Sequence, residues 1–592
     1  MQENPILYYT NRLLDFNSQL KAVKRLLYLS SLFRFVVFLG TSFAIYTTFD
    51  QWKISLLCAI VGVIGFVFLL LRHLKLAYKR DKIKALIAMN QLEIDVLNGN
   101  ISKLPTGDEF IDPSHFYSYD IDLFGPNSLF QYINRTSTEE GKRKLATLFT
   151  SNDIEGIFQK QQVVEELSYK ADWRQNFTAI SSLIKNNTNV NTLTNWLTNY
   201  TSFVPKIMRF LPSVFSAISI VITVLFFIDL VPTVVFYAWF FLGLGISAIY
   251  VGRVNSLSNH TSTVSDTFSE YSKLIACVES AEFACDGLKK QQEKLIQEQV
   301  LASGIVQEFS KLLSALDSRN NIFIGMVLNG FFLWDLKQSF LIEVWIEKYH
   351  SKVADWFEVI AFFDAQNSLG NYVFNHPKFQ TASISPSENV VLKAEKLGHP
   401  LLKTKGRIDN DFTIEKEQFF IVTGANMAGK STFLRTVSLS IVLCNMGLPI
   451  CASKAIYSPI KLITSMRTSD SLAEGSSYFF AELQRLKTIV DAVKSDKYFI
   501  ILDEILKGTN SHDKALGSKK IVRQFAYQKA CGIIATHDLS LCELEEEISA
   551  VENYFFDAEI INDELFFGYL LKKGICSNMN ASFLLKKMEI VS

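Results

Sequence analysis

Residues 424–432, Gly-Ala-Asn-Met-Ala-Gly-Lys-Ser-Thr, have the composition of a loop that binds phosphate groups. An apolar run at 419–422 precedes them and a helical pattern at 433–446 follows, so we expect a strand, this loop and a helix in sequence. In such a loop, backbone N–H groups surround the phosphates, Lys430 reaches the outer ones and the Ser431 hydroxyl binds Mg²⁺. The sequence therefore predicts a nucleoside triphosphate site at the amino end of a helix.

Two further apolar runs end in polar residues of the kind that such a site uses. The run at 498–502 ends in Asp503 and Glu504, and the run at 531–535 leads to His537. We expect Asp503 in the Mg²⁺ shell through water, Glu504 to polarise the attacking water and His537 to donate to the terminal phosphate. Alone, each would be an ordinary polar strand end. Together with the phosphate loop they predict hydrolysis of the triphosphate.

These motifs resemble, in order and spacing, the ATPase domain of the MutS mismatch-repair family. The resemblance lies in residues 423–432, 477–483, 502–513 and 535–538, and the stretches 127–145 and 161–167 are similar to the start of that family's helical core. It implies ATP and Mg²⁺ as cofactors and a homodimer formed through the ATPase domains. The site residues expected are Glu504, His537 and, from the second subunit, Ser477 for catalysis; Gly424, Asn426, Gly429, Lys430, Ser431, Thr432 and Arg407 for the nucleotide; and Ser431 and Asp503 for Mg²⁺.

Some residues depart from the family pattern. Ala425 and Ala428 stand where proline and glycine are usual, which should leave the loop intact because Gly424 and Gly429 remain. Arg407 takes the position of an aromatic residue that stacks on adenine. A guanidinium plane can also stack on a base, so we still expect ATP. The stretch 568–591 is similar to the family's C-terminal piece that packs against the neighbouring ATPase domain, and by the same resemblance residues 510–513 lie at that interface.

Length and charge limit the classes of function. The chain has 592 residues, which indicates several domains, and 59 basic against 59 acidic residues, so no overall field attracts nucleic acid. Any DNA contact must be local. Eight cysteines without a Cys-x-x-Cys pair predict neither a disulfide framework nor a zinc site, which is typical of a reducing cytoplasm.

Four long apolar runs indicate membrane anchoring. Residues 35–49 and 54–71 form one pair, and residues 210–228 and 234–251 form another, each joined by a short turn. We interpret them as two helical hairpins of four spans, with buried helices of a soluble protein as the alternative. Basic residues flank both pairs and no cleavable signal peptide is predicted. We therefore expect a multi-pass protein of the cytoplasmic membrane, the lipid bilayer as a partner and all soluble parts in the cytoplasm.

The apolar run at 322–334 is shorter and contains Asn329. Its length is more typical of a core or interfacial helix than of a membrane span, and we expect it not to cross. Crossing remains the alternative.

The fold expected is multidomain, α and α/β: a MutS-like helical core and lever domain, a C-terminal P-loop ATPase domain of the ABC type, and two transmembrane hairpins. The boundaries expected are 1–25 for an N-terminal cytoplasmic segment, 26–72 for hairpin 1, 73–209 for the first part of the helical core, 210–252 for hairpin 2 in place of the family's DNA clamp, 253–376 for long lever helices and 377–592 for the ATPase domain.

Three functions are compatible with these features. The first is a membrane-anchored MutS-like ATPase whose dimer changes conformation with nucleotide state. The second is a module that binds mismatched or branched DNA at the membrane, as the family resemblance implies. The third is an ATP-driven transport-related device without a DNA ligand. The triplet Phe268-Ser-Glu270 lies in a helical stretch, where we expect a packed side chain rather than a base-stacking wedge, so mismatch recognition is not predicted.

Overall fold

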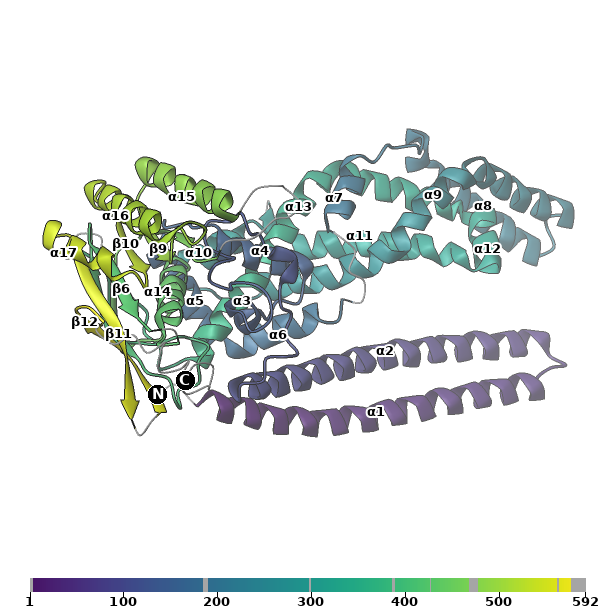
Figure 1. Cartoon of the computed structure of the whole chain (residues 1–592). Helices are drawn as coiled ribbons and strands as arrows, with labels where there is room; N and C mark the ends of the chain where they lie inside the picture. The colour runs from purple at the N-terminus through teal and green to yellow at the C-terminus, as the bar shows by residue number, and fades with distance from the viewer. Residues whose placement is uncertain are drawn as a thin grey trace.

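The computed structural model describes residues 4–184, 190–297, 300–385, 389–425, 427–467, 478–561 and 564–576. It has a C-terminal α/β domain at one end, a helical body in the middle, and two long helical arms that point away from the α/β domain (Figure 1). The multidomain, mainly helical architecture with mixed sheets that we expected is confirmed.

The first arm consists of two long antiparallel helices. These are α1 (Pro5–Thr47) and α2 (Trp52–Leu97), joined by a turn in which the Thr48 and Ser55 hydroxyls lie 3.0 Å apart. A Cβ atom on Gly62 would lie 2.2 Å from the Thr41 side chain, so glycine lets the two helices approach closely. Neither helix breaks at the expected boundaries near residues 25 and 72, so the apolar hairpin and its polar continuation are the same pair of helices.

The second arm ends in a cluster of three apolar helices. Helix α8 (Leu211–Phe227) turns into α9 (Thr233–Glu279), and the short α12 (Ile322–Phe332) packs beside them. Phe215 and Trp239 stack with ring centroids 4.4 Å apart. A Cβ atom on Gly243 would lie 2.3 Å from the Gly330 carbonyl oxygen, so α9 and α12 touch through their backbones. Small residues at helix contacts are typical of membrane helices.

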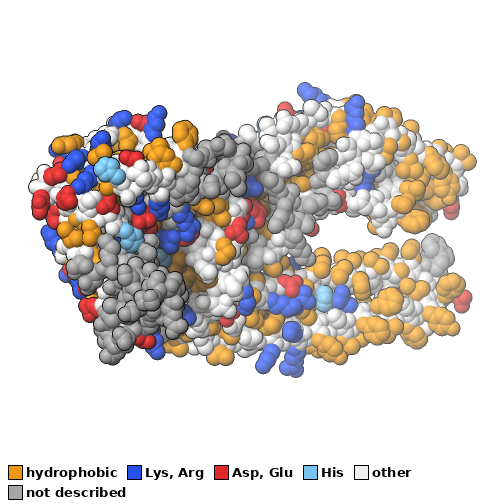
Figure 2. Space-filling model, in the orientation of Figure 1, with side chains coloured by type: hydrophobic (Ala, Val, Ile, Leu, Met, Phe, Trp, Pro, Cys, Tyr) orange, Lys and Arg blue, Asp and Glu red, His pale blue; other side chains and the backbone are white. Residues whose placement is uncertain are grey.

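Apolar side chains remain exposed at the far ends of both arms (Figure 2). By length and composition, three helical stretches could cross a membrane: residues 5–47, 54–97 and 233–259. The most apolar part of the second of these has no buried residues. The fourth expected span, α8, has 17 residues, and α12 has 11, so both are shorter apolar helices. Exposed apolar area of this extent is typical of a surface that contacts an apolar partner.

A single long helix, α13 (Trp334–Asn375), organises the body. With 42 residues it is about 63 Å long. Phe268 is fully buried and its ring lies 4.8 Å from that of Phe309, so it is a packed helix residue as expected. The other elements of the body are η1 (Asp108–Phe110), α3 (Leu129–Ile133), α4 (Glu139–Thr150), α5 (Ile157–Tyr169), α6 (Ala171–Ser181), α7 (Val190–Thr198), η2 (Lys206–Arg209), α10 (Asp286–Glu293), β1 (Ile296–Gln297), β2 (Val300–Leu301), α11 (Ala302–Asp317) and η3 (Ser318–Asn320).

The C-terminal domain contains a six-stranded sheet of order β12-β11-β6-β10-β9-β8, parallel except for β12, and a four-stranded sheet of order β3-β7-β4-β5. Helix α14 packs on one face of the larger sheet, and α15 and α16 pack on the other. The elements are β3 (Ser383–Ile384), β4 (Val390–Leu397), β5 (Asn410–Glu415), β6 (Phe419–Gly424), α14 (Lys430–Asn445), β7 (Lys454–Tyr457), β8 (Lys461–Ser465), α15 (Tyr478–Ser495), β9 (Tyr498–Asp503), α16 (Ser511–Tyr527), β10 (Cys531–Ala535), η4 (Leu539–Glu543), α17 (Leu544–Glu547), β11 (Val551–Ile561) and β12 (Glu564–Lys573).

A buried carboxylate joins α13 to the start of α4. Asp364 accepts hydrogen bonds from the Thr138 backbone N–H at 2.8 Å and from the Thr138 hydroxyl at 2.6 Å, and the N–H of Ser137 lies 3.1 Å away. Thr138 in turn caps α4 by accepting from the Gly141 N–H. Burial raises the pKa of Asp364 to about 6 despite these donors.

This buried carboxyl predicts a pH-dependent contribution to stability. Its pKa is higher in the folded chain than in the unfolded one, so its contribution is complete below about pH 4 and is lost as the pH rises through 6. Over that window the free energy of unfolding should fall by about 3 kcal/mol. We expect Asp364→Asn to flatten this dependence, as measured by thermal unfolding at ~pH 5 and ~pH 7.5. Asp355→Asn, an exposed change on the same helix, should behave like the parent; an unchanged dependence in Asp364→Asn would show the assignment to be wrong.

Candidate functional site

A pocket of about 640 Å³ lies at the carboxyl ends of β6, β9 and β10. In an open parallel sheet this edge is where ligands bind, because loops and helix amino ends meet there. Residues from all three strand ends line it together with residues of β5, α14 and β12: Leu397, His399, Leu402, Gly406, Arg407, Ile408, Asn410, Ala425, Met427, Gly429, Lys430, Ser431, Thr432, Phe433, Thr436, Asp503, Glu504, Lys507, His537, Phe556 and Tyr569.

The loop between β6 and α14 lines one side of the pocket. Gly424 and Gly429 have φ values of 146° and 105°, a region that favours glycine. Helix α14 begins at Lys430, whose amino group donates to the carbonyl oxygens of Gly424 at 2.7 Å and Ala425 at 3.0 Å. A cation and the helix amino end therefore face the same space, which suits phosphate groups. Asn426 lies outside the described residues.

Two oxygen-bearing side chains meet beside Lys430. The Ser431 hydroxyl donates to Asp503 Oδ2 at 2.7 Å. A hydroxyl and a carboxylate are hard ligands, and Mg²⁺ in phosphate sites is usually held by one or two such groups plus the phosphates themselves. The pair thus fits the Mg²⁺ site that we expected from the sequence. Within the described part of the chain, no group of three or more His, Cys, Asp and Glu side chains could hold a metal by itself.

Glu504 and His537 also lie close to Lys430. The His537 Nε2 atom is 3.2 Å from the Lys430 amino group and 4.0 Å from the Glu504 carboxylate, and Lys514 is 3.7 Å from that carboxylate. Glu504 has a φ of 52°, a conformation that costs energy for a residue other than glycine, and its N–H donates to the Ala535 carbonyl at 2.9 Å. The strain is held in place by the neighbouring strand.

The pKa values of His537 and Lys430 are both lowered. Burial, and then the nearby Lys430 charge, lower the pKa of His537 below its usual value, so the imidazole is neutral at pH 7. Burial also lowers the pKa of Lys430, opposed by the charges of Asp503 and Glu504. A neutral imidazole carries one N–H and one free nitrogen, so His537 can donate one hydrogen bond without adding charge.

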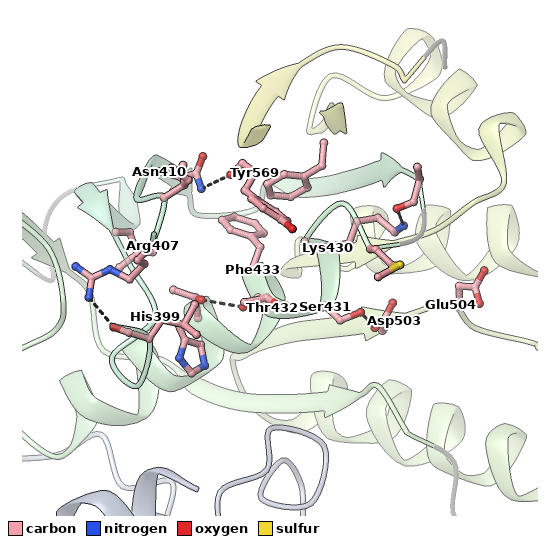
Figure 3. Close-up of a pocket in the computed structure, with 18 of the residues that line it drawn as sticks. His399, Arg407, Asn410, Lys430, Ser431, Thr432, Phe433, Asp503, Glu504 and Tyr569 are labelled. Atoms are coloured by element: carbon pink, nitrogen blue, oxygen red, sulfur yellow. Dashed lines mark hydrogen bonds between the residues drawn. The ribbon is translucent and has the colours of Figure 1, made fainter. Parts of the chain in front are cut away.

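The end of the pocket away from Asp503 holds groups that sequence reasoning missed. Figure 3 shows Phe433, Tyr569 and Asn410 there, with His399 on a neighbouring loop. The Asn410 amide donates to the Tyr569 carbonyl at 3.0 Å and accepts from the Leu571 N–H, which fixes β12 beside β5. These positions carry no recognisable motif. An aromatic wall at this end suits a planar base.

Arg407 lines the same end, but its guanidinium is engaged with its own neighbours. It donates to the Asp409 carboxylate from Nε at 2.6 Å and from Nη2 at 3.2 Å, and to the Leu402 carbonyl at 3.3 Å (Figure 3). This pairing fixes the plane of the guanidinium at the rim of the pocket. Stacking of Arg407 on a base stays a prediction.

Ser477, expected to act on the neighbouring subunit's nucleotide, lies outside the described residues. Glu482, in the same motif, is buried and accepts a hydrogen bond from the Lys507 N–H at 3.0 Å. It thereby holds the loop that follows Glu504. Glu482 lies one turn into α15, after a stretch that contains glycine and serine. This sequence pattern does not predict the contact.

Comparison with known proteins agrees with this geometry. Residues 420–589 match MutS domain V. The chain is 34% identical over 195 residues to the DNA mismatch repair protein MutS of Aquifex pyrophilus, and 33% identical over 191 residues to that of Clostridium perfringens. It is 28% identical over 231 residues to MutS protein homolog 4 of Homo sapiens. These matches cover 32%, 31% and 37% of this chain and 22%, 21% and 24% of the respective relatives.

The close contact between Gly429 and Tyr569 predicts a sensitive position. A Cβ atom on Gly429 would lie 3.0 Å from Tyr569, and the backbone there has φ of 105°. We expect Gly429→Ala to weaken binding of a fluorescent nucleoside triphosphate by about tenfold or more, because strain of ~1–2 kcal/mol adds to the steric contact. Combining Gly429→Ala with Tyr569→Ala removes the steric contact but not the backbone strain, so it should restore only part of the nucleotide binding. Gly568→Ala, whose Cβ would meet open space, is the control, and equal binding by Gly429→Ala and this control would contradict the assigned geometry.

Proposed function

Because the chain belongs to the MutS family through its C-terminal domain, we propose that it is an ATP hydrolase that works as a nucleotide-dependent conformational switch anchored in a membrane. The observation that carries the proposal is the meeting of three strand ends at one pocket. Lys430 lies 3.2 Å from His537, which lies 4.0 Å from Glu504, and the Ser431–Asp503 pair lines the same pocket.

In the proposed reaction the protein mainly orients groups and balances charge. The Lys430 amino group turns from the Gly424 and Ala425 carbonyls to the outer phosphate oxygens. Glu504 accepts a hydrogen bond from the attacking water and aligns it, and the neutral His537 donates its N–H to the terminal phosphate. Mg²⁺ neutralises phosphate charge when bound, and Ser431 and Asp503 are the residues that would hold it.

We propose that two chains pair through their ATPase domains, as the family resemblance implies. Ser477 of one chain would then reach the terminal phosphate held by the other. The pocket of a single chain is open to solvent rather than enclosed, which supports completion of the site by a second copy. Hydrolysis would accordingly depend on dimerisation.

The proposed anchor consists of hairpins at residues 26–72 and 210–252, with lever helices at 253–376 and the ATPase domain at 377–592. Both apolar arm tips lie at the same end of the molecule, opposite the ATPase domain, which supports insertion of both into one bilayer (Figure 1). Arg72, Lys75 and Lys79 follow the apolar part of α2, where they would meet the cytoplasmic headgroups.

Helix α13 offers a mechanical route between the two ends. It touches α12 at the apolar tip and α4 and α5 beside the ATPase domain. Closure of the nucleotide site would therefore tilt a single rigid element that reaches the second arm. Movement of the apolar tips with nucleotide state is the switch that we propose.

The assignment of Glu504 predicts a separation of binding from turnover. We expect Glu504→Gln to bind ATP but to release phosphate about a hundredfold more slowly, because the water is no longer oriented. Lys430→Ala should lose both. The measurement is phosphate release and nucleotide binding by the full chain in detergent, with the exposed Glu546→Gln as the matched control. Parent-like turnover by Glu504→Gln would remove the proposed mechanism.

DNA is the first ligand to add to this assay, because the relatives are named for DNA mismatch repair. Stimulation by mismatched, branched or single-stranded DNA, lost at high salt, would support DNA as a partner. Turnover that depends on Lys430 but ignores every DNA would favour the alternative, an ATP-driven membrane or transport-related device without a DNA ligand.

The proposed topology predicts which residues face away from the cytoplasm. Cysteines introduced at the two turns, Asp50→Cys and Asp229→Cys, should react with a membrane-impermeant maleimide added to intact cells, and Lys84→Cys should react only after lysis. The parent chain, with Cys58 in the apolar part of α2, gives the background. Equal labelling of all three in intact cells, or of none even after lysis, would contradict two membrane hairpins.

A further inference from the structure

A second, smaller cavity lies in the body where the first arm joins it. It has a volume of about 200 Å³ and lies between α2, α6, α13 and the loops before α3 and α4. One wall is apolar, formed by Met89, Leu92, Leu104 and Pro105, and the other residues that line it are polar or charged. The cavity shares no lining residue with the pocket of the proposed ATPase site.

The charges around this cavity do not balance. Glu93 forms a buried ion pair with Arg135 at 2.6 Å and also accepts from the amides of Asn371 at 3.0 Å and Asn375 at 2.9 Å. Arg174 is 4% exposed, and among the described residues no carboxylate lies within 4.0 Å of it. One carboxylate thus faces two guanidinium groups in a buried place, which leaves a positive charge without an ion-pair partner.

Arg174 makes two hydrogen bonds within the described part of the chain, both to uncharged groups. Its Nε donates to the Leu167 carbonyl at 2.8 Å and its Nη1 to the Asn371 side chain at 2.9 Å. Its Cζ atom lies 5.6 Å from the centre of the Phe374 ring. Burial lowers the pKa of this guanidinium, and the nearby Glu93 charge opposes that shift.

Two buried amides on the same cavity lack partners. Asn367 is 4% exposed, and neither its Nδ2 nor its Oδ1 atom is hydrogen-bonded within the described residues. Asn134 is fully buried, its Oδ1 accepts from Thr136, and its Nδ2 is likewise unpartnered there. Leaving such buried groups unpaired is unfavourable, so a ligand or water is expected beside them.

We propose that this cavity binds a small organic acid that carries a hydroxyl or ammonium group beside its carboxylate. The carboxylate would pair with Arg174 and the free amide N–H groups, and the neighbouring donor would reach the Asn367 oxygen. The apolar wall would hold the short carbon body. The volume excludes a nucleotide but accommodates a molecule of a few carbon atoms, since it equals roughly seven waters.

The position of the cavity gives the ligand a structural role. Tyr9 of α1 donates to Asn375 of α13 at 2.8 Å, and Gln175 of α6 exchanges hydrogen bonds with Asn90 of α2. The cavity lies beside this network, so an anion bound in it would brace the first arm against α13. This inference rests on the body alone and stands or falls independently of the ATPase proposal.

The test is calorimetric titration and thermal unfolding of the full chain in detergent with lactate, alanine, propionate, propionamide and inorganic phosphate. Lactate or alanine should bind saturably and raise the Tm of the protein. Propionate should bind more weakly, and propionamide should not bind. Saturation by lactate alone would identify a hydroxy acid, and by alanine alone an amino acid. Phosphate binding in place of both, or no saturation by any probe, would overturn the proposal and leave water as the occupant.

Variants separate the site from general effects on folding. Arg174→Gln should weaken binding by about tenfold or more. Because that change is buried, Thr178→Leu, which fills the cavity, and Asn367→Leu, which removes the unpaired amide, provide independent readouts. Both should lose binding, and Asn367→Leu should also raise the Tm of the unliganded chain. Arg12→Gln, which removes a 2.6 Å ion pair between α1 and α6 outside the cavity, is the control. Parent-like affinity in Thr178→Leu and Asn367→Leu would also overturn it.

Discussion

The arrangement of the arms and body depends on one buried polar network along α13. Glu93 of α2 is enclosed by Arg135, Asn371 and Asn375, and Tyr9 of α1 joins from the other side. A buried carboxylate is stable only when several donors reach it at once, which few relative positions of the helices allow. Asp364 of α13 meets the same requirement with donors at the start of α4, and this contact ties the core to α13. These contacts explain why helices far apart in sequence share one rigid axis.

The meeting of Lys430, Asp503, Glu504 and His537 at one pocket was predictable to a large extent. Parallel strands bring their carboxyl ends to one edge, so Asp503 and His537 had to approach Lys430 once the three apolar runs were recognised as neighbouring strands. Tyr569 was not predictable, because it reaches the pocket through an antiparallel edge strand with an irregular register and a φ of 50°. A register shift of this kind leaves no pattern in sequence. The pairing of Arg407 with Asp409 could likewise be read only from the structure.

The apolar runs predicted helical pairs and turns but not the ends of the helices. The expected boundary near residue 72 separates apolar from charged residues, and α2 continues through it for 25 residues to Leu97. Helices end where caps, glycine or proline interrupt them, whereas a change in polarity alone alters only what surrounds them. Composition therefore indicates which segments expose apolar side chains, and the contacts that join the arms to the body can be read only from the structure. Residues 322–334 show the same limit, since α12 is apolar and exposed yet short.

The lengths of the apolar runs have a consequence for the proposed anchor. Helix α8, with 17 residues, is about 26 Å long, and the apolar run 54–71 of α2 is about 27 Å long, so both are slightly shorter than the ~30 Å thickness of a typical hydrocarbon core. In a bilayer, both tips would therefore favour thinner lipid around them. Bilayer thickness would then act on both arms in the same sense, and lipid composition would act on the same rigid axis as the nucleotide.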